Sequence, residues 1–144
     1  PHDNAMIASG LARYGFRDAA SQIFTGLFEA SNYMDLRRLP ELFCGFPRQR
    51  GAGPVFYPVA CSPQAWATAA PLMLLQATLG LSFEVANKRI LFNQPTMPAF
   101  ADEIILRNLR VGEDSADVAI RRSSNGVLVD VLKRTPACSV VYVA

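Results

Sequence analysis

The chain has 144 residues, 51% of them hydrophobic, and its 14 basic and 12 acidic side chains leave a formal net charge of +2. So small an excess of positive charge, without runs of Lys and Arg among aromatic residues, argues against a nucleic-acid partner. The length suits one domain, or parts of two, with a sizeable core.

The first two predicted helices cover residues 4 to 14 and 18 to 33. Apolar side chains recur every three or four residues along them, which is typical of helices with one buried face: Ile7, Leu11, Tyr14, Ala19, Ile23, Phe24, Leu27 and Phe28. Gly15 follows the first helix where a terminating glycine is expected, and Asp18 can cap the first turn of the second. The two segments predict a helical hairpin.

A third helix is predicted from Ser62-Pro63 to about Leu79, before Gly80. Serine is a favoured N-cap, and proline at the first helical position loses no hydrogen bond. The segment is apolar nearly all the way round, so we expect it to be buried on all sides.

Beyond Gly80 the pattern changes to short alternating runs, which favour strands. These runs are residues 81–86, 89–94, 102–111, 116–122, 127–133 and 139–144. Asn125-Gly126 is the dipeptide that best joins two antiparallel strands. The sequence therefore predicts an α+β fold, with a helical domain at 1–80 and an antiparallel β domain at 81–144.

Cysteine usage and hydropathy bear on cofactors and location. The three cysteines, Cys44, Cys61 and Cys138, form no CxxC pair, and His2 is the only histidine. We expect reduced thiols, no metal, no cofactor and a cytoplasmic protein, although a Cys44–Cys61 bridge stays open. No basic segment followed by an apolar core begins the chain, and its longest apolar run is shorter than the about 20 residues of a spanning helix. The sequence predicts neither a signal peptide nor a membrane partner.

Residues 39 to 66, LPELFCGFPRQRGAGPVFYPVACSPQAW, form an unusual connector rich in proline, glycine and aromatic residues. A long loop is usually functional or disordered, and the aromatic content argues against disorder. Glu41 is its only acid. A carboxylate held by rigid backbone beside aromatic rings can act as a general base or nucleophile; the alternative is a solvated loop acid.

Four other residues are candidates for ligand contacts. Trp66 and Gln64 lie at the start of the third helix and can point back toward the loop, although a tryptophan is commonly a core residue and Gln64 can instead cap backbone amides. His2 and Asp3 lie at the start of the first helix, where capping is the favoured role of Asp3. No GxSxG, Walker A, dinucleotide-binding or HExxH motif occurs.

Three segments taken together carry a family resemblance. The ordered trio PHDNAMIASGLARYGF, LPELFCGFPR and CSPQAW resembles the C-terminal end of bacterial amylo-alpha-1,6-glucosidases, which are glycogen-debranching-type glycoside hydrolases of the six-hairpin superfamily. The resemblance covers nearly the whole chain. It implies the last three or so helices of a twelve-helix (α/α) barrel, followed by a small antiparallel β domain whose role the motifs do not specify.

The resemblance also implies roles for individual residues. Glu41 would be the catalytic base, and His2, Asp3, Gln64 and Trp66 would contact an α-glucan or α-glucoside substrate. The implied reaction is inverting hydrolysis of an α-glucosidic bond, with the general acid on a segment upstream of residue 1. A hypothesis from another class is a non-catalytic carbohydrate-binding or structural module.

The chain begins without Met at the start of a helix, so we expect it to be part of a longer protein. Helices taken from a barrel would expose apolar faces that neighbouring helices normally cover. We expect residues 1–80 to be covered by the upstream part of the same protein or by another chain, over a face that includes Leu11, Ile23, Phe24, Leu72 and Leu75.

Overall fold

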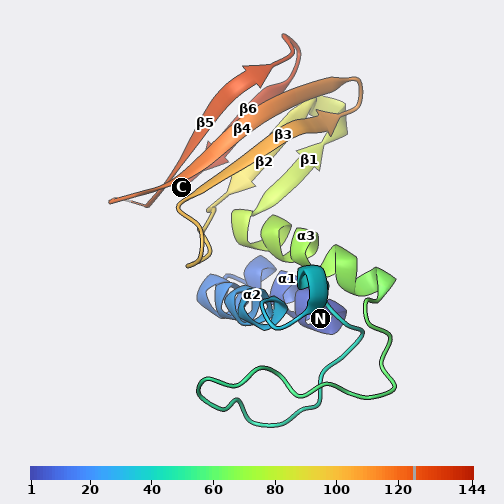
Figure 1. Ribbon diagram of the computed structural model, residues 1–144. Helices are drawn as coiled ribbons and strands as arrows, with labels where there is room; N and C mark the ends of the chain where they lie inside the picture. Colours follow the sequence, from blue (N-terminus) through green and yellow to red (C-terminus); the bar gives the residue numbers. More distant parts are fainter. Residues whose placement is uncertain (125) are drawn as a thin grey trace. The chain divides into compact units, whose positions relative to one another are not determined.

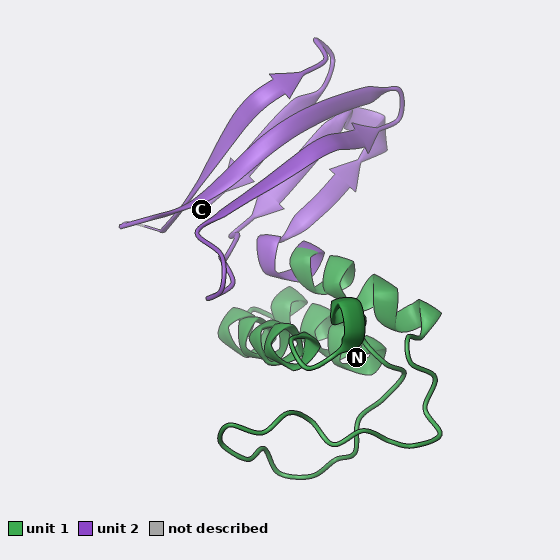
Figure 2. Cartoon of the chain, viewed as in Figure 1, with its two compact units in different colours: residues 1–75 green, residues 76–144 purple. Residues whose placement is uncertain are grey.

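The computed structural model describes residues 1–124 and 126–144 (Figure 1). The chain consists of two compact units, Pro1–Leu75 and Gln76–Ala144 (Figure 2). The described residues form three α-helices and two small sheets in which most strand pairs are antiparallel. The fold is therefore mixed α+β, as the sequence predicts.

The first unit opens with a helical hairpin. Helix α1 (His2–Arg13) packs against α2 (Arg17–Ser31). Gly15 adopts a left-handed φ of 88°, and its N–H donates to the Ala12 carbonyl while the Phe16 N–H donates to the Leu11 carbonyl. This pair of bonds is a Schellman ending, in which glycine takes the left-handed position without steric cost. The predicted helix end at Gly15 is confirmed.

The buried face of α1 differs from the predicted one. Ile7 and Tyr14 are 56% and 81% exposed, and the buried residues are the alanines Ala5, Ala8 and Ala12. The alanines repeat at the same three-and-four spacing as the larger side chains, so periodicity alone does not choose between the two faces. In α2 the prediction fares better, because Phe24 and Leu27 are buried.

The predicted cap at Asp18 is wrong. Helix α2 begins one residue earlier, at Arg17, so that Phe16 occupies the N-cap position and makes no side-chain cap bond. Asp18 then lies inside the first turn, where a carboxylate stabilises a helix only through its charge near the N-terminal amides.

Helix α3 (Ala65–Leu79) starts two residues after Pro63 and not at it. Gln64 is the residue whose carbonyl accepts the first helical bond, from the Thr68 N–H at 3.3 Å. Within this chain the helix is not covered on all sides, since Leu72 is 71% exposed. A uniformly apolar helix carries no pattern that says which of its faces meets other parts of the chain.

The second unit contains two three-stranded sheets. The first has the order β1-β2-β6 and consists of β1 (Leu81–Glu84), β2 (Arg89–Asn93) and β6 (Ser139–Val143). The second has the order β3-β4-β5 and consists of β3 (Glu103–Val111), β4 (Asp114–Ser123) and β5 (Gly126–Arg134). Short 3₁₀ turns cover Asp35–Arg37 and Val85–Asn87.

One strand pair departs from the predicted antiparallel arrangement. Strands β2 and β6 pair in parallel, with Ile90 opposite Val140, whereas the other named pairs are antiparallel. These two strands are separated in sequence by the whole second sheet, and turn signals report only connections between neighbouring strands. The predicted Asn125-Gly126 turn falls partly outside the described residues, although β4 and β5 pair from Ser123 and Gly126 onward.

The middle strand of each sheet supplies the core of the second unit. Ile90 and Phe92 of β2, and Val118 and Ile120 of β4, are completely buried. Alternate residues of a strand point to the same face, so each pair marks the inner face of its sheet. The two sheets approach each other, because β2 lies near β3 and β5 lies near β6.

A polar cluster joins parts of this unit that are far apart in sequence. Asp114, which is nearly buried, lies 2.9 Å from the Lys88 ammonium through Oδ2, and its Oδ1 accepts a 2.8 Å hydrogen bond from the Thr135 hydroxyl. The bonds from Lys88 and Thr135 hold the pKa of Asp114 below its ordinary value. Asp114 therefore stays ionised and ties three separate turns together.

Candidate functional site

The long connector between α2 and α3 is a paired structure. Its two arms, residues 39–44 and 55–64, run antiparallel and exchange backbone hydrogen bonds. The N–H of Glu41 donates to Cys61 O at 2.8 Å, that of Cys44 to Val55 O at 3.0 Å, and that of Gln64 to Leu39 O at 3.4 Å. An isolated bridge joins Phe43 and Phe56. This pairing satisfies backbone groups that would otherwise need water.

The base of the loop is anchored by burial. Met34 and Leu39 are buried, and Pro40 is completely so. Glu41 follows directly, so its backbone continues from a segment whose side chains are packed and whose φ at Pro40 is fixed by the ring. Its backbone position is therefore set on one side by packing and on the other by the bond to Cys61.

The Glu41 carboxylate is held by the opposite arm. Oε2 accepts a 3.2 Å hydrogen bond from the Cys61 N–H, and the side chain is half-buried. Across residues 1–124 and 126–144, no cation lies within ion-pair distance of this carboxylate. A carboxylate with one oxygen fixed by a backbone amide and no neutralising partner can accept a proton from water or from a hydroxyl group.

His2 and Trp66 form a stacked pair. Their ring centroids are 4.6 Å apart and the ring planes differ by 25°. Trp66 is 49% exposed, so much of the indole surface remains open beside the imidazole. His2 Nδ1 is buried and, within the described part of the chain, has no hydrogen-bond partner. Trp66 is therefore a partly exposed aromatic surface and not the core residue that a tryptophan commonly is.

Asp3 lies on the other side of the imidazole. Its Oδ1 is 3.1 Å from His2 Nε2, and no side-chain cap bond forms at the start of α1. The preferred capping role of Asp3 is thus wrong. Pro1 takes the N-cap position, which puts Asp3 inside the first turn, where it can orient the imidazole through Nε2.

Gln64 connects the two parts of the site. Its Oε1 accepts a 2.8 Å bond from the Ala65 N–H, which confirms the alternative in which this side chain caps backbone amides. The backbone N–H of Gln64 donates to the carbonyl of Leu39, which lies two residues before Glu41. Trp66 lies two residues after Gln64. The structure thus joins His2, Asp3 and Trp66 by direct contacts, and links Glu41 to them through the paired base of the loop.

The register of the loop pairing separates Cys44 from Cys61, the two cysteines for which the sequence left a disulfide possible. Cys44 pairs with Val55 and Phe56, whereas Cys61 pairs with Glu41, and both cysteines are free. They occupy different rungs of the same ladder. A bridge would need the arms to shift register, which the Phe43–Phe56 pairing opposes.

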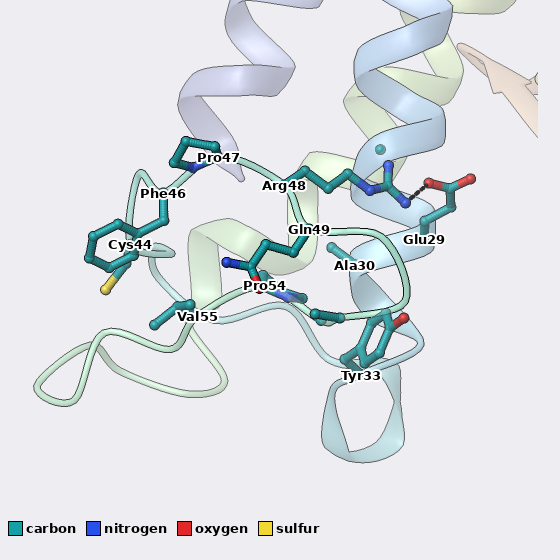
Figure 3. Close-up of a pocket in the computed structure, with 13 residues that line it drawn as sticks. Glu29, Ala30, Tyr33, Cys44, Phe46, Pro47, Arg48, Gln49, Pro54 and Val55 are labelled. Atoms are coloured by element: carbon teal, nitrogen blue, oxygen red, sulfur yellow. Dashed lines mark hydrogen bonds and ion pairs between the residues drawn. The ribbon is translucent and has the colours of Figure 1, made fainter.

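The tip of the loop forms a pocket that the sequence reasoning missed. A pocket of about 490 Å³ lies between residues 44–55 and a wall made by α2 and by Tyr33, which follows that helix. Figure 3 shows Arg48 of the loop directed toward Glu29 of α2. Glu41, His2 and Trp66 are not among the lining residues. The pocket depends on contacts between segments about twenty residues apart, for which short-range patterns carry no signal.

Comparisons with known proteins add no assignment: no protein-family model matches the chain, and no curated protein sequence matches it. No α-helix within residues 1–124 and 126–144 has the length and hydropathy required to cross a bilayer. The same residues contain no group of three or more His, Cys, Asp or Glu side chains arranged to hold a metal ion.

Proposed function

We propose that the first unit is the C-terminal part of the catalytic (α/α) barrel of a glycoside hydrolase that cleaves α-glucosidic bonds by inversion, as in glycogen debranching. Glu41 is the general base in this proposal, and the general acid belongs to a segment upstream of residue 1. The substrate is an α-glucan or α-glucoside, and residues 1–80 pack against that upstream segment. The second unit has no assigned part in the reaction.

The observation that carries the proposal is the placement of the Glu41 carboxylate. It is half-buried, fixed by the Cys61 amide and linked through the loop base to the stacked His2 and Trp66 rings. Aromatic faces suit the C–H faces of a pyranose, and the exposed part of the Trp66 indole can supply such a face. These features supply a base and a sugar platform on neighbouring elements.

The reaction balances as follows. The Glu41 carboxylate takes a proton from a water molecule as the water oxygen attacks the anomeric carbon, and the bond from that carbon to the glycosidic oxygen breaks. The upstream acid gives its proton to the leaving oxygen. In inverting enzymes the two carboxyl groups are about 6.5 to 9.5 Å apart, which leaves room for the water.

The test is Glu41→Gln in the protein that contains this chain together with its upstream segment. We expect turnover of a cleavable α-glucoside such as panose to fall by about two to four powers of ten while sugar binding is retained, because only proton transfer is lost. Proton NMR of the first product should show the β-anomer, as inversion requires.

Glu113→Gln is the matched control, because Glu113 is exposed at the turn between β3 and β4. It should leave turnover unchanged. Turnover by Glu41→Gln close to that of the parent, with the same fold by circular dichroism, would contradict the assignment of the base.

A non-catalytic carbohydrate-binding module is the second candidate. It is favoured by the pocket at the loop tip, which lies outside the Glu41 region. Under this hypothesis the longer protein binds α-glucans without cleaving them, and Glu41→Gln changes nothing in any hydrolysis assay. The panose experiment therefore separates the two candidates.

A further inference from the structure

The pocket at the loop tip has the lining of a binding site for a small amphipathic ligand. Its volume of about 490 Å³ falls in the range of about 300 to 1,000 Å³ typical of small-molecule sites. Tyr33 and Phe46 line it and are both exposed, so their ring surfaces are open to a ligand. Apolar groups such as Pro54 and Val55 complete the wall, as Figure 3 shows.

The charges in the pocket favour a neutral, hydroxylated ligand. Arg48 reaches from the loop to Glu29 of α2, with Nη2 2.6 Å from the carboxylate (Figure 3). These two opposite charges neutralise each other, so the pocket offers an anion or a cation little net attraction. The guanidinium still has donors and the carboxylate still has acceptor positions, which is the combination that binds adjacent hydroxyl groups.

The position of Tyr33 depends on a glycine. A Cβ added at Gly53 would lie 2.6 to 2.7 Å from atoms of the Tyr33 ring, closer than non-bonded carbons approach. The backbone of Gly53 therefore rests directly on the tyrosine and holds it against the pocket wall. An aromatic ring fixed in this way loses little side-chain freedom when a ligand stacks on it.

We propose that this loop-tip pocket is a second carbohydrate site, separate from the Glu41 region, that binds one or two sugar rings of a neutral oligosaccharide. Tyr33 and Phe46 contact the C–H faces of the sugar, and the Glu29–Arg48 pair binds its hydroxyl groups. The choice of an α-glucan as the oligosaccharide rests on the proposed function. The existence of a neutral-sugar site does not, because it follows from the lining of the pocket.

The experiment is a titration of the full 144-residue chain, isotope-labelled, with maltohexaose, followed by two-dimensional amide NMR. We expect shifts at Tyr33, Phe46, Arg48 and Gly53 that saturate in the millimolar range or below. Tyr33→Ala should weaken this binding about tenfold, as expected for loss of a stacking anchor. Tyr57→Ala is the matched control, since Tyr57 is an exposed tyrosine of the same loop that does not line the pocket, and it should bind as the parent does.

Arg48→Ala provides a second variant, because its ion pair is exposed and its loss should not prevent folding. It should weaken binding by several-fold and decides the matter if Tyr33→Ala does not fold. A ligand concentration of about 10 mM still detects weak, millimolar binding. If the pocket residues show no chemical-shift change up to that concentration of maltohexaose, the proposal is overturned. Equal affinity of the parent and both variants overturns it as well.

Two further experiments test this proposal separately from the assignment of Glu41 as the catalytic base. Glu41→Gln should leave the maltohexaose shifts in the pocket unchanged, because Glu41 does not line it. If hydrolysis proves independent of Glu41 while the shifts persist, the second site stands without the catalytic assignment. Titration with cellohexaose tests the linkage: equal binding keeps the sugar site and overturns its α-glucan specificity.

Discussion

The two units bury their large side chains to very different extents. Among the described residues, the largest fully buried side chains belong mostly to the second unit: Phe92, Leu79, Ile90, Ile120, Val111, Val118, Thr78, Pro98 and Cys138. The first unit contributes only Leu74 and Pro40 to that group. Both units expose large apolar side chains, but the first unit exposes more of them, among them Tyr14, Phe16, Leu36, Phe46, Val59 and Leu72.

This difference follows from how much apolar surface the elements of each unit can bury against one another. Two sheets of three strands can bury one face of each sheet against the other, so each middle strand is covered. Three helices and a long loop offer fewer faces to cover each other. A soluble monomer rarely exposes contiguous apolar surface of more than a few hundred Å², so the comparison fits the proposal that further protein covers residues 1–80.

The five side chains expected on the covered face behave unevenly. Phe24 is buried within this chain and Leu72 is 71% exposed, whereas Leu11, Ile23 and Leu75 are half-buried. The chain alone therefore does not bury all five side chains. Complete burial of the five within this chain would have removed the reason to expect a covering partner.

The largest expected effect is the difference in free energy of unfolding between Phe92→Ala and Leu72→Ala. Phe92 is completely buried, so its truncation should lower the free energy of unfolding by about 3 to 5 kcal/mol. Leu72→Ala removes an exposed side chain from a helix and should change it by less than about 0.5 kcal/mol. Urea unfolding followed by circular dichroism measures both. Similar losses for the two variants would break the contrast between the units.

A second prediction concerns the polar cluster of the β unit. The pKa of Asp114 is lowered in the folded state, so its contribution to stability is present above the pKa of the unfolded chain and is lost as pH falls through the folded-state pKa. The thermal midpoint should fall on acidification from neutral pH to below about pH 4, where an unperturbed aspartate takes up its proton. Asp114→Asn should lower the midpoint at pH 7 and flatten this acid dependence.

Glu113→Gln again serves as the control for Asp114, because it removes a neighbouring exposed charge that lies outside the cluster. Its acid dependence should follow that of the parent. An Asp114→Asn curve that parallels the parent curve would show that Lys88 and Thr135 do not stabilise the unit through this carboxylate.

The smallest effect is expected in α1. Gly10 is exposed in the middle of the helix, and an added Cβ meets no atom within 4 Å. Gly10→Ala should therefore raise the free energy of unfolding by about 0.5 to 1 kcal/mol, because alanine restricts the unfolded chain more than glycine does. Thermal unfolding measures it. A loss of stability would mean that the exposed side of α1 is more crowded than the contrast between the units implies.

Much of the local structure was readable from the sequence. The six alternating runs after Gly80 all became strands, and Gly15 ended the first helix as expected. The unusual composition of residues 39 to 66 identified the segment that holds Glu41 and the pocket. Periodicity and glycine chemistry act over a few residues, so a single sequence contains the information that decides them.

Only the tertiary structure decided which groups meet. The sequence did not determine that Ala5, Ala8 and Ala12 would form the buried face of α1, that β6 would pair in parallel with β2, or that Arg48 would reach Glu29. A resemblance suggested His2, Asp3, Gln64 and Trp66 as substrate contacts, whereas the stacking of His2 on Trp66 and the pairing of Glu41 with Cys61 come from the fold. Contacts between distant segments depend on the packing of whole elements, whose competing faces look equivalent in the sequence until one of them is covered.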